Sequence, residues 1–281
     1  ESVIHDEEVP VLRISEVLPP VVRKAALQRG WKIWEDNETG GEEQQSPQEW
    51  HLHWKSGRFK PSEYTDALPY QRVNHFPKSW LITRKDMLVR NIRKMRATYG
   101  SIYGFVPISF ILPNEYTKFI KHYTSQGKQT AWICKPSDLA RGQKIFIFSH
   151  LNDLIYDQEC VLQEYVERPL LIGGYKNDLR IYVAVTSFHP LEAYIYQDGL
   201  VRFSTEKYND DFTNLFSHLT NSSINKHNPE LKNEKEVIGS GCKWDFRQFE
   251  KWVGERWRPP PPGGGNGNGG GGGGGAEAAG P

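Results

Sequence analysis

Two long stretches of alternating side chains, residues 178–187 and 191–197, lie in the second half of this chain. Such alternation is typical of half-buried strands, so we expect two neighbouring strands of one sheet. The dipeptide Asp198-Gly199 supplies the positive backbone angles of a two-residue hairpin, and it predicts a tight turn. Arg202 then lies on the returning strand between apolar neighbours. Burying a lone guanidinium costs roughly several kcal/mol, so we expect it to meet an anion at a sheet surface.

Short strands and helices are predicted for much of the remaining chain. Pro19-Pro20 predicts the start of a helix over residues 21–28, which Gly30 can end. Apolar runs predict further strands at residues 11–14, 131–135, 144–148 and 160–166. This mixture of elements favours a mixed α/β (α+β) fold.

A basic helix is predicted after residue 83. Thr83 with Asp86 resembles a capping box, and apolar side chains then recur at helical spacing, at Leu88, Ile92, Met95 and Tyr99. We therefore expect one buried face. The other faces carry basic side chains that either meet an acidic partner or are simply solvated: Arg84, Lys85, Arg90, Arg93, Lys94 and Arg96.

Composition excludes some classes of function. The net charge is only +1, so nothing in the overall balance calls for nucleic acid or a membrane surface. Cys134, Cys160 and Cys242 have no metal-type spacing and are interpreted as reduced thiols of a cytosolic protein. An acidic start and the lack of a long apolar run argue against secretion and against a membrane span.

Three segments have a simpler interpretation. Residues 35–48 are polar and predict a surface loop, and Trp50 and Trp54 beyond it are interpreted as core residues. From Pro259 the chain consists mostly of proline and glycine, which bury little apolar area, so residues 254–281 are expected to be a disordered tail.

A lysine near a glycine-containing loop could hold phosphate. Lys135 ends one predicted strand, and Arg141-Gly142 follow in the next loop, where an ammonium and backbone N–H groups can share negative charge. A surface lysine before a turn would look the same. The strand end at 163–166 could present backbone groups to an adenine edge, or it could be an ordinary edge strand.

Polar side chains gather again on and after the long strands. Lys176 could reach phosphate or ribose, while Asp178 could accept a sugar hydroxyl or simply pair with Arg180. Short polar residues then crowd one segment, which either forms a ligand site or caps a helix: His218, Thr220, Asn221, Ser223 and Asn225. No glycine-rich nucleotide motif and no nucleophile-elbow context for a Ser-His-Asp triad are present.

Taken in order, these motifs resemble the tubulin tyrosine ligase-like family, in its probable tubulin polyglutamylase branch. The segments that carry the resemblance are WICKP, ARGQKIFIF, VLQEYV, KNDLRIYV, YQDGLVRFST and HLTNSSINK, and it extends over residues 10–253. It implies a two-lobed, ATP-grasp-like fold with ATP between the lobes. It also implies that ATP activates a protein carboxylate as an acyl phosphate, which the amine of a free amino acid then attacks.

The resemblance also implies roles for individual residues. Lys135 and Arg202 are expected to be catalytic, and the glutamate substrate is expected to contact Arg202, Ser222, Ser223 and Lys243. The nucleotide is expected to contact Lys135, Arg141, Gly142, Gln163, Glu164, Tyr165, Val166, Lys176, Asn177, Asp178, Thr220 and Asn221. A dicarboxylate amino acid needs a cation and short donors, which agrees with these residue types.

The chain departs from the family where magnesium ligands are expected, an aspartate followed by a Glu-Val-Asn segment. After Trp244 the carboxylates are Asp245, Glu250, Glu255 and Glu277, none of them beside a suitable asparagine in a predicted strand. We therefore expect no magnesium ligand in this chain, an incomplete second lobe and weak turnover.

Two functions stay open at this point. One is an ATP- and magnesium-dependent ligase that adds glutamate to the C-terminal tails of tubulin, as a cytoplasmic monomer on microtubules or in a cilium, with no nucleic acid or membrane partner. The other is a non-catalytic member of the family that binds nucleotide or microtubules.

Overall fold

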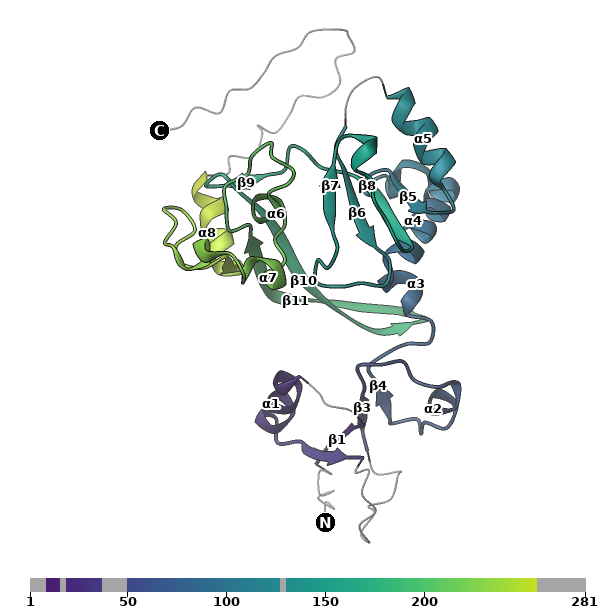
Figure 1. Cartoon of the computed structure of the whole chain (residues 1–281). Helices are drawn as coiled ribbons and strands as arrows, with labels where there is room; N and C mark the ends of the chain where they lie inside the picture. Colours follow the sequence, from purple (N-terminus) through teal and green to yellow (C-terminus); the bar gives the residue numbers. More distant parts are fainter. Residues whose placement is uncertain (1–8, 16–18, 37–49, 127–129, 257–281) are drawn as a thin grey trace, which may run out of the picture. The chain divides into compact units, whose positions relative to one another are not determined.

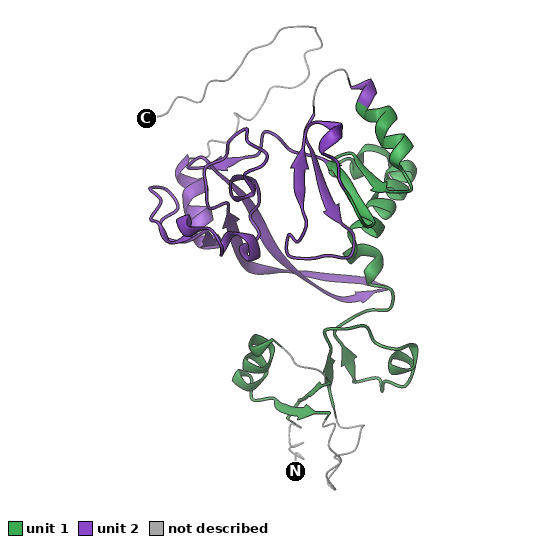
Figure 2. Ribbon diagram, viewed as in Figure 1, with its two compact units in different colours: residues 1–123, 156–163 green, residues 124–155, 164–281 purple. Residues whose placement is uncertain are grey.

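The computed structural model describes residues 9–15, 19–36, 50–126 and 130–256 (Figure 1). The chain divides into two compact units (Figure 2). Unit 1 comprises residues 1–123 and 156–163, and unit 2 comprises residues 124–155 and 164–281. Helices and strands alternate in both units, so the expected mixed α/β class is confirmed.

Unit 1 begins with a small parallel sheet in the order β2-β1-β3-β4. Its strands are β1 (Val11–Ile14), β2 (Lys32–Glu35), β3 (Leu52–Trp54) and β4 (Arg72–Val73), and helix α1 (Pro20–Gln28) connects the first two. The predicted strand and helix are confirmed, and Gly30 follows the helix with a φ of +74°. Trp50 is buried and Trp54 packs on the cluster around Leu12, as the core interpretation requires.

The rest of unit 1 contains the basic helix α4 (Lys85–Tyr99). The remaining elements are α2 (Pro61–Thr65), α3 (Trp80–Thr83), η1 (Gly100–Tyr103), β5 (Ser109–Leu112), α5 (Tyr116–Ser125) and β8 (Cys160–Glu164), and the last residues of α5 and β8 belong to unit 2. β5 pairs with β8 in antiparallel fashion.

The predicted start of α4 is wrong by one residue. Thr83 ends α3, and Arg84 is the N-cap residue of α4, with its guanidinium donating to Asp86 at 3.0 Å. The predicted buried face is also displaced, because Val89 packs against β5 and β8 while Leu88 and Tyr99 are exposed. Helical spacing alone does not say which of two adjacent residues meets the sheet.

Unit 2 holds two groups of strands. β6 (Trp132–Pro136) pairs with β7 (Phe146–Phe148), and the second sheet has the order β12-β11-β10-β9. The strands of this second sheet are β9 (Leu171–Ile172), β10 (Tyr175–Phe188), β11 (Leu191–Phe203) and β12 (Lys243–Asp245). The helices are η2 (Leu151–Asp153), α6 (Leu215–His218), α7 (Ser222–Asn225), η3 (Pro229–Lys232) and α8 (Phe246–Arg256). The predicted strands around 131–135, 144–148 and 160–166 are confirmed with slightly different limits.

β10 and β11 form one long two-stranded ribbon (Figure 1), and its turn lies at His189-Pro190. The predicted turn at Asp198-Gly199 is therefore wrong. Gly199 lies inside β11, opposite Ile181, and the next pair along the ribbon is Val183 with Ile195. Between these two pairs β10 advances by two residues and β11 by four, so the pairing is irregular at Gly199. The Asp198 carboxylate accepts a hydrogen bond from the Gly199 amide at 2.7 Å, a local contact of the kind that made the dipeptide resemble a turn.

Gly199 is required there by space. A Cβ atom at this position would lie 2.5 Å from the carbonyl oxygen of Arg180 and 2.6 Å from the Phe246 ring. Because a backbone oxygen cannot give way cheaply, we expect Gly199→Ala to lower the free energy of unfolding by about 2–3 kcal/mol in urea denaturation.

The matched control is Gly254→Ala in α8, where an added Cβ has nothing within 4 Å. Alanine is the better helix former, so this variant is expected to gain about 0.5–1 kcal/mol. Equal effects of the two substitutions would contradict the close approach at Gly199.

Cys134, Cys160 and Cys242 are buried, and no disulfide joins these three described residues. Within the described ranges, no helix combines the length and the apolar character needed to cross a membrane. Residues 37–48 of the predicted loop and residues 257–281 of the predicted tail lie outside the described residues. Glu35 is the last residue of β2, and residues 254–256 are the last residues of α8, where a loop and a disordered tail were expected.

Candidate functional site

The centre of the candidate site is an ion pair across the long ribbon of unit 2. Asp178 on β10 lies directly opposite Arg202 on β11. The guanidinium donates from Nε at 2.8 Å and from Nη2 at 2.6 Å to the two carboxylate oxygens. Thr220 donates its hydroxyl to the same carboxylate at 2.5 Å. Asp178 therefore holds a cation from one strand and a hydroxyl from the segment between α6 and α7 in fixed positions.

Lys176 lies two residues before Asp178, on the same face of β10. Its ammonium donates to the Tyr165 hydroxyl at 2.5 Å and lies 4.2 Å from the centre of that ring. The pKa of Lys176 is lowered to about 8, mainly by burial and also by the nearby charge of Lys135, while the carboxylate of Asp178 opposes both effects. Asp178 acts on Lys176 and on Arg202, and Lys135 acts on Lys176, so the three cations belong to one electrostatic cluster.

The predicted phosphate loop packs against the polar segment that follows Thr220. Arg141 and Gly142 have left-handed φ angles of +59° and +82°. The Ser223 hydroxyl donates to the Arg141 carbonyl oxygen, and a Cβ on Gly142 would lie 2.5 Å from the Ile224 side chain. The glycine is needed both for its backbone angle and for this close contact. Two segments that the sequence separates are therefore neighbours in unit 2.

A buried polar frame supports the segment after His218. Asn225 accepts from the Thr205 hydroxyl at 2.8 Å and donates to the Leu219 carbonyl at 2.8 Å. Asn228 donates to the same hydroxyl at 2.9 Å. Asn225 is fully buried and satisfied, so its role is structural: it fixes the backbone that presents Thr220.

Other predicted site residues lie apart from this cluster or have structural contacts. Asn177 points to the opposite face of β10 and donates to the Leu170 carbonyl at 2.9 Å. Gln163 belongs to unit 1 and donates to the Ser109 hydroxyl at 2.9 Å. Lys243 on β12 lies opposite Arg202 in the sheet with an exposed side chain. The remaining predicted contacts show no polar contact that adds to the cluster: Glu164, Val166, Asn221 and Ser222.

Tyr165 has a role that its sequence position does not reveal. Its backbone was expected to meet adenine, yet its buried side chain lies between Lys176 and His218. A strand-ending tyrosine and a distant histidine carry no spacing signal, so only the fold brings them together.

The described residues do not suit a magnesium ion. Across the four described ranges, no group of three or more His, Cys, Asp or Glu side chains is placed to hold a metal. Asp178 already accepts from Arg202 and Thr220. We therefore derive no step through a metal from these residues.

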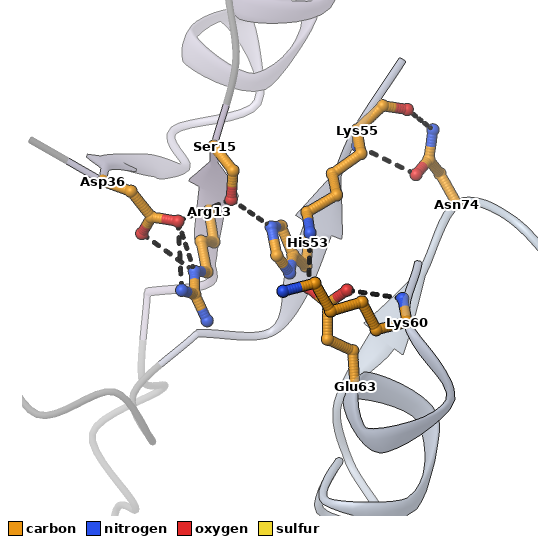
Figure 3. A network of polar contacts seen from close by, with 8 residues as sticks. All are labelled: Arg13, Ser15, Asp36, His53, Lys55, Lys60, Glu63 and Asn74. Atoms are coloured by element: carbon orange, nitrogen blue, oxygen red, sulfur yellow. Dashed lines mark hydrogen bonds and ion pairs between the residues drawn. The ribbon is translucent and has the colours of Figure 1, made fainter. Parts of the chain in front are cut away.

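A second polar network lies in the small sheet of unit 1 (Figure 3). The Ser15 hydroxyl contacts both Asp36 and His53 at 2.5 Å, and Arg13 forms a fork with Asp36 at 2.9 and 3.0 Å. The order is not that of a catalytic triad, because the serine lies between the histidine and the carboxylate and the carboxylate does not orient the imidazole. The network joins β1, β3 and the end of β2, and we assign it a structural role.

This network predicts sensitivity to acid. Burial and the neighbouring charges of Arg13 and Lys55 lower the pKa of His53 to about 4, although Asp36 and Glu63 oppose the shift. The unfolded chain binds the proton at higher pH than the folded chain, so stability is lost as pH falls from about 6.5 to about 4, by about 2–3 kcal/mol. Urea denaturation at about pH 7.5 and about pH 4.5 should show this loss reduced in His53→Gln. An exposed control, His227→Gln, should retain it, and equal pH dependence of all three proteins would contradict the assignment.

Two hollows in unit 1 contain none of the predicted site residues. One, of about 280 Å³, is lined by Val89, Arg93, Arg96, Phe110 and their neighbours, and the other, of about 360 Å³, lies between α1 and the small sheet. The cationic cluster of unit 2 is therefore the candidate site on grounds of chemistry rather than of cavity size.

Mixed α/β units with a cationic cluster ordered by one carboxylate define a candidate anion-binding protein. Comparison with known proteins is more specific. The model of the tubulin-tyrosine ligase family matches residues 63–259, which is more than half of the chain, and the chain belongs to this family.

Similar proteins carry polyglutamylase names. "Probable tubulin polyglutamylase TTLL2" of Homo sapiens is 45% identical over 246 residues, which are 85% of this chain and 40% of that protein. The Mus musculus protein of the same name is 45% identical over 248 residues, covering 85% and 44%. "Tubulin polyglutamylase TTLL7" of Mus musculus is 42% identical over 209 residues, covering 71% and 23%. The chain thus spans less than half the length of these relatives. The family resemblance is confirmed, and the mixed α/β structure is consistent with the ATP-grasp-like fold that it implies.

Proposed function

We propose that the chain is the ligase portion of a tubulin polyglutamylase that uses ATP to add glutamate to glutamate side chains of tubulin tails. The polyglutamylase names of its relatives support the substrate and the reaction class. The single observation that carries the proposal is the cationic cluster in which Asp178 pairs with Arg202, and Lys176 lies within reach of the charges of both Asp178 and Lys135. Free glutamate, a monomeric state and a location on microtubules are part of the same proposal.

The cluster suits the charges of the proposed reaction. The γ-phosphoryl group of ATP passes to a carboxylate of the acceptor glutamate, which releases ADP and forms an acyl phosphate. The amine of the incoming glutamate then attacks the acyl carbon, the C–N bond forms, and phosphate leaves while the amine loses a proton to solvent. Lys135 and Lys176 supply positive charge for the phosphates, and the Thr220 hydroxyl is held in the same cluster by its hydrogen bond to Asp178.

Arg202 retains donors for a second anion. Asp178 accepts from Nε and from Nη2, which leaves both N–H groups of Nη1 and one N–H of Nη2. These can meet a carboxylate of free glutamate, while Asp178 keeps the guanidinium plane in one orientation. Positioning of the amino acid is the role that we propose for Arg202.

Magnesium is a proposed cofactor of the complete reaction, in which it would neutralise phosphate charge. Because the described residues of this chain gather no ligand set for it, we expect this chain by itself to turn over slowly. A non-catalytic member of the family that binds nucleotide is the second candidate function, and the same lack of ligands favours it.

Incorporation of labelled glutamate into tubulin, with ATP and magnesium, separates the two. For a ligase we expect ATP-dependent incorporation that Lys135→Ala lowers at least about tenfold, because a phosphate contact is lost. The exposed Lys251 of α8 supplies the matched control, Lys251→Ala, which should retain incorporation.

For a binder we expect no incorporation, together with binding of a non-hydrolysable ATP analogue that Lys135→Ala weakens. A chain that neither incorporates glutamate nor binds the analogue would contradict both functions.

A further inference from the structure

A continuous line of polar contacts runs from Lys176 into the interior of unit 2. The Lys176 ammonium donates to the Tyr165 hydroxyl at 2.5 Å, and this hydroxyl lies 2.9 Å from Nδ1 of His218. On the far side of the imidazole, Nε2 lies 3.0 Å from the carbonyl oxygen of Asp211. The line joins β10, the end of β8 and α6.

The chemistry of the two ends fixes the protons between them. A backbone carbonyl only accepts, so Nε2 of His218 carries a proton and donates to Asp211. An ammonium only donates, so the Tyr165 oxygen accepts from Lys176. The phenolic proton is then free to point to Nδ1, which must be bare, and His218 is neutral. Lys176, Tyr165 and His218 therefore each donate one hydrogen bond along the line. If His218 were protonated at Nδ1, two donors, this N–H and the Lys176 ammonium, would point at the Tyr165 oxygen.

The two rings have little freedom to leave this arrangement. Tyr165 is 6% exposed and His218 is 1% exposed. Phe212 contacts both rings at centroid distances of 5.8 and 5.3 Å, and Tyr208 contacts the imidazole edge-on at 4.9 Å. The Tyr208 hydroxyl donates to the Glu167 carbonyl, and it also interacts with the Tyr165 hydroxyl. This packing fixes the Tyr165 and His218 rings, and it thereby fixes the Tyr165 hydroxyl oxygen that accepts from Lys176.

We propose that Tyr165 and His218 are positioning residues that hold the Lys176 ammonium in place for a nucleotide phosphate. The proposal rests on the proposed function, since it assigns to Lys176 the phosphate contact of the ligase. Neither residue touches the nucleotide through its side chain in this scheme. A held ammonium avoids the loss of side-chain freedom that a flexible lysine would undergo when it binds phosphate.

The proposal predicts a distinctive pH profile for nucleotide binding. Lys176 faces Tyr165, Lys135 on β6 and Asp178 on β10, and its pKa is lowered to about 8, so affinity should fall as pH rises through this value. His218 faces Tyr165, Lys176, Asp210 and Asp211, and burial lowers its pKa below the usual 6.5. Affinity should therefore fall again at acid pH, when imidazole protonation breaks the line.

The test combines two variants of His218 with two of tyrosine. His218→Phe retains a ring in the aromatic packing and removes both nitrogens, whereas His218→Asn places an amide oxygen near the position of Nδ1. Binding of a non-hydrolysable ATP analogue is measured by titration calorimetry across the pH range. We expect His218→Phe and Tyr165→Phe to weaken binding about tenfold, the cost of a lost hydrogen bond to a charged group, and His218→Asn to restore most of the affinity. The matched control, Tyr194→Phe, removes an exposed hydroxyl of β11 and should bind as the unmodified chain does.

A second readout needs no nucleotide. In the ligand-free chain, the lysine Cε signal of Lys176 is assigned by its loss in Lys176→Arg, and its NMR titration is then followed in the variants. The midpoint should be lower in Tyr165→Phe and His218→Phe and unshifted in Tyr194→Phe. Unchanged midpoints in the first two folded variants would overturn the positioning role. If the midpoints move as expected while the unmodified chain binds no nucleotide, the proposed function fails and the positioning of Lys176 stands.

Discussion

Arg202→Lys is expected to lower glutamate incorporation about 100-fold while it changes affinity for an ATP analogue by less than about threefold. The positive charge beside Asp178 is kept, so the electrostatics of the phosphate contacts change little. The planar fork is lost, and with it both the two-point contact to Asp178 and the remaining donors for a substrate carboxylate. Steady-state kinetics at varied glutamate concentration should place most of the loss in kcat/KM for glutamate.

Arg247→Lys, on an exposed position of α8, is the matched control and should be indistinguishable from the unmodified chain. If Arg202→Lys lost nucleotide affinity and kept its dependence on glutamate concentration, Arg202 would belong to the nucleotide site instead, and its proposed role would be wrong.

Lys176→Met is expected to have opposite effects on function and stability. Removal of the ammonium should weaken binding of the ATP analogue about 100-fold, because a buried phosphate contact is lost. The same change removes a charge that burial and Lys135 disfavour. We therefore expect the free energy of unfolding near neutral pH to rise by about 1–2 kcal/mol, smaller than the full pKa shift implies, because the contact with Tyr165 is lost as well.

The pH dependence of this gain has a definite sign. The unfolded chain holds the Lys176 proton up to about pH 10.5 and the folded chain only up to about pH 8, so the stability of the unmodified chain should rise between these values. Lys176→Met should lack that rise, and the exposed control Lys232→Met should retain it. A fall in stability of Lys176→Met near neutral pH would show that the ammonium is stabilising where it lies.

Helices and strands were predicted well where the signal comes from residues that are close together in the sequence. The strand Val11–Ile14 and the helix from Pro20 follow from apolar spacing and proline placement. The long ribbon was expected from its alternation, but its turn was placed at Asp198-Gly199 instead of at His189-Pro190. A turn dipeptide shows where a chain can reverse, and the pairing of whole strands decides where it does.

The composition of the site could be predicted, whereas its contacts could not. The order of motifs indicated Asp178, Arg202 and Thr220 as parts of one site, and the fold brings these three together. The contact of Ser223 with Arg141 spans 82 residues, and that of Tyr165 with His218 spans 53. No spacing rule reaches so far, so side chains such as Tyr165 were assigned by their backbone position alone.

Lysine footprinting tests the central claim most directly. The chain is acylated with a limiting amine-reactive reagent, with and without an ATP analogue, and modified peptides are quantified by mass spectrometry. We expect the analogue to protect Lys135 and Lys176 together, while the exposed Lys232 and Lys251 are modified equally in both conditions. Protection of neither lysine at saturating analogue, or of one without the other, would contradict a shared phosphate site.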